Sequence, residues 1–118
     1  MASRRANANT KFRFGGDFEL DLGAYELRCS GEPLKLARIP MEVLQLLIKR
    51  RGQLVRRDQI IENIWGKDIS IDVDRNINEI IKKIRKVLQE DAGQPRFVKT
   101  VYTQGYRFIA PVKKVSTG

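Results

Sequence analysis

A long amphipathic segment between Asp72 and Gln89 constrains the fold more than any other feature of the sequence. At about 100° per residue, its aliphatic residues fall on one side of a predicted helix: Ile77, Ile81, Ile84 and Leu88, bordered by Ile80 and Val87. The opposite arc is polar and carries Asp72, Asn76, Glu79, Lys83 and Lys86. Such a helix must bury its apolar stripe against other elements and leave its polar face in solution.

Two shorter helices are predicted upstream of this segment. The first begins at Pro40. Proline has no backbone N–H, and in the first turn of a helix that N–H would have no hydrogen-bond partner within the helix anyway. This helix ends before Gly52, a residue suited to the turn that follows a helix. Its apolar stripe consists of Val43, Leu44, Leu47 and Ile48. The second runs near 56–65 and places Ile60, Ile61, Ile64 and Trp65 on one face.

Short strands are predicted on both sides of the helices. Between Phe12 and Leu36 apolar residues alternate with polar ones and glycine-containing turns interrupt them, which is typical of three or four antiparallel strands. After Gly93, the runs RFVKTV and YRFIAPV predict a β-hairpin over about 96–110. We therefore expect an α+β domain over 11–112, preceded by a disordered arm (1–10) and followed by a tail or linker (113–118).

The chain is strongly basic, with a net charge of +9 and an isoelectric point near 10.1. Such an excess attracts a polyanion and speeds the encounter with it. Nucleic acid is the first candidate partner and an anionic membrane surface the second, while a basic protein that is merely well solvated is the third interpretation. The amphipathic helices use their apolar faces for a core, which disfavours the membrane surface.

Residue usage argues against an enzyme and against metal binding. Histidine is absent and Cys29 is the single cysteine, so an intramolecular disulfide, the usual zinc site and a histidine-based catalytic pair are all excluded. Glu90 and Asp91 lie at a helix end without any sign of a pocket. We expect no enzyme activity, no metal and no cofactor. No apolar run reaches the ~20 residues that span a bilayer, so a cytoplasmic, nucleoid-associated protein without membrane contact is expected.

Four stretches are similar to one known family: GEPLKL, QLVRRDQIIENIWG, DVDRNINEIIKKIRKVL and RFVKTVYTQGYRFIAPV. Together they resemble the DNA-binding (effector) domain of OmpR/PhoB-type response regulators over about residues 12–110. They look most like members of that family fused to modules other than a receiver. The resemblance implies a winged helix-turn-helix: a four-stranded N-terminal antiparallel sheet, a three-helix core and a C-terminal hairpin wing. It also implies sequence-specific binding of duplex DNA for transcription regulation.

By this resemblance the third helix (about 72–89) enters the major groove, where each base pair presents its own donors and acceptors. Asn76 can then pair with adenine, Lys83 with guanine and Glu79 with cytosine. The phosphate contacts expected from side chains beside the groove are those of Arg75, Lys82, Arg85 and Lys86 on this helix and Arg56, Arg57 and Trp65 on the second. The plain alternatives are solvated charges on the surface and, for Trp65, a core aromatic.

The predicted hairpin tip departs from the family pattern. The usual tip arginine is missing, and Tyr102, Thr103 and Gln104 stand in its place as candidate contacts to the DNA backbone or groove edge. The resemblance further implies a head-to-tail dimer on DNA and a contact between the 67–71 loop and RNA polymerase, for which a plain connector is the alternative. A winged helix that binds protein or RNA without reading DNA sequence is the competing function.

Overall fold

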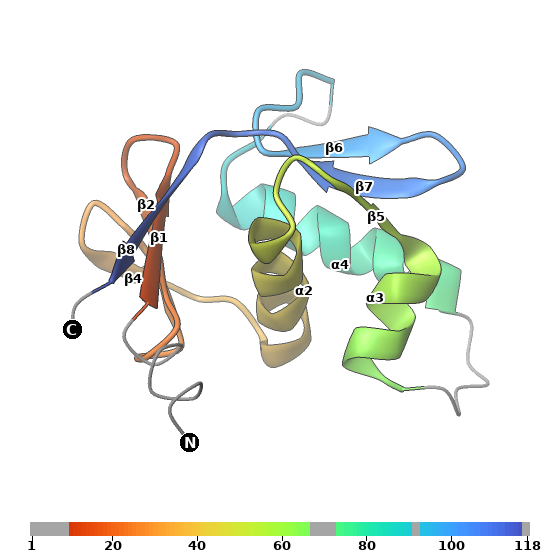
Figure 1. Ribbon diagram of the computed structural model, residues 1–118, viewed down its shortest axis with the longest axis horizontal. Helices are drawn as coiled ribbons and strands as arrows, with labels where there is room; N and C mark the ends of the chain where they lie inside the picture. Colours follow the sequence, from red (N-terminus) through yellow and green to blue (C-terminus); the bar gives the residue numbers. More distant parts are fainter. Residues whose placement is uncertain (1–9, 67–72, 91–92, 117–118) are drawn as a thin grey trace. The chain divides into compact units, whose positions relative to one another are not determined.

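The computed structural model describes residues 10–66, 73–90 and 93–116. These residues form two compact units. The first contains the residues up to Lys35 and those from Pro111 onward, and the second runs from Leu36 to Ala110. Both contain antiparallel sheets, and the helices among the described residues belong to the second, so the α+β prediction is confirmed (Figure 1).

The first unit is a five-stranded antiparallel sheet in the order β4-β3-β2-β1-β8. Its strands are β1 (Thr10–Phe14), β2 (Phe18–Asp21), β3 (Glu26–Cys29), β4 (Glu32–Leu34) and β8 (Val112–Ser116). Leu20 in β2 pairs with Phe12 of β1 on one side and with Leu27 of β3 on the other. These three side chains therefore share one face of the sheet, and all are buried. The rings of Phe14 and Phe18 stack at 5.5 Å.

Two boundary predictions for this unit are wrong. Thr10 is buried and begins β1 instead of belonging to the arm, whose residues 1–9 lie outside the described ones. The segment expected to be a tail supplies β8, which pairs with β1 as far as Ser116 and adds a fifth strand to the four that were expected. Without β8, the N–H and C=O groups on that side of β1 would form an open sheet edge.

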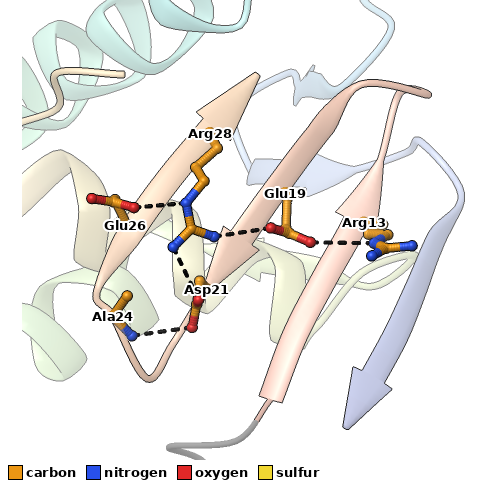
Figure 2. A network of polar contacts seen from close by, with 6 residues as sticks. All are labelled: Arg13, Glu19, Asp21, Ala24, Glu26 and Arg28. Atoms are coloured by element: carbon orange, nitrogen blue, oxygen red, sulfur yellow. Dashed lines mark hydrogen bonds and ion pairs between the residues drawn. The ribbon is translucent and has the colours of Figure 1, made fainter. Parts of the chain in front are cut away.

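The polar face of this sheet carries a charge network centred on Arg28 (Figure 2). The guanidinium of Arg28 donates to Glu26 at 2.7 Å, to Glu19 at 2.9 Å and to Asp21 at 3.1 Å. Asp21 also accepts the backbone N–H of Ala24. Burial opposes ionisation of Asp21, but the Ala24 N–H and the Arg28 guanidinium outweigh it and hold the pKa of the Asp21 carboxyl below its ordinary value.

We therefore expect acid to remove the stabilisation that Asp21 provides. Because its pKa is lowered by folding, the contribution is complete above the unfolded-state pKa, which is about 3.9, and is lost as the pH falls through the folded-state value. The measurement is the free energy of unfolding of the wild type and of Asp21→Asn between pH 7 and pH 2. The gap between them should close in acid, and a gap that does not change with pH would contradict this account.

The second unit contains the three helices and a three-stranded sheet in the order β5-β7-β6. Its elements are α2 (Arg38–Lys49), β5 (Leu54–Arg56), α3 (Arg57–Ile64), α4 (Val73–Val87), β6 (Val98–Val101) and β7 (Gly105–Phe108). The core comes from all of them: Val43, Leu44, Leu47, Ile48, Val55, Ile60, Ile77, Ile81, Ile84, Leu88, Phe97, Val98 and Phe108, each at most 1% exposed. The predicted apolar stripe of α4 is thus confirmed.

Helix boundaries differ slightly from those expected. Helix α2 begins two residues before Pro40, which is still within the first turn, where a missing N–H breaks no helical bond. Helix α4 runs from Val73 to Val87, and its C-terminal end is marked by Gln89 in the left-handed region at φ 58°. The predicted first residue, Asp72, lies outside the described residues.

Candidate nucleic-acid interface

Helix α4 presents an exposed polar face opposite its buried stripe. The candidate base-reading residues Asn76, Glu79 and Lys83 are all exposed, as are Lys82 and Lys86. Lys82 Nζ lies 3.9 Å from Glu79 Oε1, and both side chains remain mostly in solution, at 74% and 60% exposed. Such a solvent-screened pair holds neither side chain firmly. Both groups are therefore available to a ligand.

The N-terminus of α3 places two arginines beside this face. The backbone N–H of Arg56 donates to Gln59 Oε1 at 2.8 Å, which caps the helix and leaves the Arg56 side chain exposed. Arg57 is half-buried, with its guanidinium 5.4 Å from the centre of the Tyr106 ring. At the other end of α3, Trp65 is half-buried. The side chain of Arg75 and the 67–71 loop lie outside the described residues.

Arg85 is placed differently from the expectation that it contacts phosphate. Its Nη2 donates to the Val98 carbonyl at 2.9 Å and to Thr100 Oγ1 at 2.8 Å, and its Nε lies 3.5 Å from Glu90 Oε2. The guanidinium side chain is only 15% exposed. Its bonds join the end of α4 to β6, so a role in holding the wing fits the geometry better than a role in binding DNA.

Glu90 completes this connection, which no local sequence pattern indicated. Its carboxylate is fully buried and accepts the backbone N–H groups of Phe97 at 2.6 Å and Val98 at 3.1 Å. With Arg85 it fixes where β6 begins relative to α4. We call this set of contacts the Glu90 latch (Arg85, Glu90, Phe97, Val98 and Thr100).

The wing is the hairpin of β6 and β7, joined by Tyr102, Thr103 and Gln104, which are all exposed. Tyr102 is 87% exposed and is thus presented at the tip. Thr103 lies in the left-handed region at φ 61°, and Gly105, which follows the turn, also has a positive φ of 155°. Gly105 also lacks room for a side chain, because a Cβ there would collide with the backbone carbonyl of Val55 in the neighbouring strand β5.

Two further residues join the start of α3 to α4 and the wing. Asn78 Oδ1 accepts a hydrogen bond from the Tyr106 hydroxyl at 2.8 Å and one from Arg57 Nη1 at 3.4 Å. Tyr106 is buried, with 2% of its surface exposed. Asn78 was not among the candidates, because its partner in the wing lies 28 residues away along the chain. Neither contact can be read from local periodicity.

The described residues contain no cluster of three or more potential metal ligands. None of their helices combines the length and apolar character required to cross a bilayer. What remains is a helix with a basic exposed face, a second helix whose N-terminus lies beside it, and a β-hairpin alongside (Figure 1). This arrangement defines a winged helix-turn-helix domain.

Residues 31–108 match the family described as "Transcriptional regulatory protein, C terminal". The chain therefore belongs to this family, which confirms the OmpR/PhoB-type resemblance. The family consists of DNA-binding domains of transcription factors and is not a class of enzymes.

Among curated proteins, the chain is 36% identical over 76 residues to the DNA-binding dual master transcriptional regulator RpaA of Synechocystis sp.. This alignment covers 64% of this chain and 31% of RpaA. It is 32% identical over 109 residues to the transcriptional regulator HilA of Salmonella typhimurium, over 92% of this chain and 19% of HilA. The chain thus spans less than a third of either relative.

Among solved structures, the Klebsiella pneumoniae RstA DNA-binding domain in complex with the RstA box aligns with a TM-score of 0.74. The two chains are 29% identical, and the alignment covers 84% of this chain and 96% of that one. The predicted fold class is therefore confirmed by both the architecture and its neighbours.

Proposed function

We propose that this domain binds duplex DNA sequence-specifically to regulate transcription, with α4 in the major groove and the wing beside it. The observation that carries the proposal is the exposed basic face of α4 (Asn76, Glu79, Lys82, Lys83 and Lys86) in a domain of this family. An α-helix fits the major groove of B-DNA, and lysines there can meet bases or phosphates. The competing function, a module that binds protein or RNA without reading DNA, is not favoured by these relatives.

The test is binding of a labelled duplex, chosen by selection from a random pool, at several salt concentrations. About five phosphate contacts from α4 and the start of α3 should give a log–log slope of roughly −4 to −5, since each contact contributes about −0.9. Absence of binding at low salt, or an affinity that does not respond to salt, would contradict the proposal.

Within this proposal Asn76, Glu79 and Lys83 read bases, whereas Arg56, Arg57, Trp65, Lys82 and Lys86 contact phosphates. We expect Lys83→Ala to cost roughly 1–3 kcal/mol on the selected site at one base position. Arg57→Ala should instead weaken all duplexes alike, because a phosphate contact carries no sequence information. The measurement compares each variant on the selected and on a scrambled duplex. An equal loss for Lys83→Ala on both would remove its base-reading role.

We further propose that two copies bind head-to-tail on direct repeats, as the family resemblance implies. Half-sites one helical turn apart would place both α4 helices on the same DNA face. Inserting about five base pairs rotates one half-site by half a turn and should abolish cooperative binding. Cooperativity that survives inversion of one half-site would instead indicate a two-fold dimer. Binding to chromosomal DNA would place the protein at the nucleoid. The contact between the 67–71 loop and RNA polymerase stays a prediction.

A further inference from the structure

A hollow of about 350 Å³ opens beside the polar face of α4, between this helix, the start of α3 and the wing. Its lining includes Arg57, Lys82 and Arg85 as cations and Glu79 as an acid. Arg85 is engaged in the Glu90 latch, so Arg57 and Lys82 set the charge that a ligand meets. The hollow therefore favours an anion.

The amide of Asn78, which also lines the hollow, has a fixed orientation. The Arg57 guanidinium can only donate hydrogen bonds, so the Asn78 atom that faces it must be the oxygen. The Tyr106 hydroxyl donates to the same oxygen. In the part of the chain that the structure describes, no acceptor is hydrogen-bonded to Asn78 Nδ2. Its two N–H groups are thus presented to a ligand, although Asn78 is neutral.

We infer that this hollow seats one phosphate of the DNA backbone, with Asn78 as a donor and Tyr106 as the residue that positions its amide. The inference rests on the proposed function and adds to it a contact that is neither a base-reading residue nor a charged one. A phosphate oxygen accepts hydrogen bonds without donating any, which matches the donors of Asn78, Arg57 and Lys82. A base edge, which presents donors as well as acceptors, matches this lining less well.

Asn78→Asp is the most direct test. It keeps an oxygen for Tyr106 and Arg57, so the fold is retained, but it replaces the two N–H donors with a negative charge. We expect the affinity for every duplex to fall at least about tenfold and the salt slope to weaken by about 0.9. Gln53→Glu is the matched control: it makes the same amide-to-carboxylate change at an exposed residue outside the hollow, and should change affinity far less.

A second experiment identifies which phosphate of the DNA backbone occupies the hollow. Single neutral methylphosphonates are placed along the duplex, and each is tested against the wild type and Asn78→Ala. One position should weaken the wild type clearly more than it weakens Asn78→Ala, in which only Arg57 and Lys82 still meet that phosphate. Tyr106→Phe should weaken binding severalfold in the wild type and add nothing in the Asn78→Ala background, because it acts through that amide. If Asn78 and Tyr106 had only a structural role, the losses of affinity in the two variants would add, and no single phosphate position would depend on Asn78.

Binding of the wild type is measured first. If it binds no duplex at low salt, the proposed function fails and the phosphate seat fails with it. If the wild type binds and Asn78→Asp binds equally well, or if no methylphosphonate position is coupled to Asn78, only the phosphate seat is overturned.

Discussion

Replacing Glu90 with alanine is expected to destabilise the second unit by about 3–5 kcal/mol, the usual effect of removing one partner from a buried ion pair. The Glu90 carboxylate is fully buried, and the variant would leave the N–H groups of Phe97 and Val98 without their acceptor. It would also leave Arg85, at 15% exposed, without its counter-charge. Unpaired buried groups cost far more than the net gain of the bonds they replace.

The measurement is the free energy of unfolding in denaturant, with Glu62→Ala as the control because Glu62 is exposed on α3. Glu90→Gln should fall between the two variants, since its amide oxygen still accepts a backbone N–H while the charge is lost. If Glu90→Ala were as stable as Glu62→Ala, the Glu90 latch would not contribute to the fold.

Gly105→Ala is expected to cost roughly 2–3 kcal/mol, the upper part of the range for inserting extra carbon atoms into a packed region. The new Cβ would meet the Val55 carbonyl and the Arg56 Cα, which are backbone atoms and cannot rotate away. Relief requires β5 to separate from β7, and this would displace Arg56 and Arg57 at the start of α3. DNA affinity should therefore fall together with stability.

Gly52→Ala separates steric collision from backbone strain. Gly52 also has a positive φ, of 80°, but a Cβ there meets no atom within 4 Å. Its substitution should cost only about 1 kcal/mol, the penalty for an L-residue in that conformation. Equal losses for the two alanine variants, measured by thermal unfolding, would mean that the approach of β5 to Gly105 is not what requires glycine.

What the sequence predicted well depends on local spacing. The stripe of Ile77, Ile81, Ile84 and Leu88 extends over about three turns, so chance cannot easily produce it, and all four residues are buried. The exposed arc of the same helix follows from the same geometry. In contrast, β5 has only three residues and β8 begins with Val-Lys-Lys, so neither shows an alternation that a local reading can detect.

The contacts that organise the candidate site are non-local, which explains why they could not be predicted. In the sequence, Arg85 cannot be distinguished from the other basic residues of the helix. Its acceptors, Val98 and Thr100, are brought to it by the hairpin. Asn78 acquires its role only when Tyr106 reaches it from the wing. Spacing along a helix gives the direction of a side chain, but which group meets it there depends on tertiary structure.

The pairing of β8 with β1 also sets an order for folding. Thr10, the first residue of β1, pairs with Ser116, the last residue of β8. Residues 36–110 lie between β4 and β8 in the chain. During synthesis β1 to β4 can pair as soon as they emerge, whereas β1 must wait for its second neighbour until the whole helical unit has been made. Closing so long a loop costs entropy that only slowly increases with length, and folding of the intervening residues shortens it. The nascent chain therefore carries an open β1 edge, prone to misassociation, until β8 has been synthesised and pairs with it.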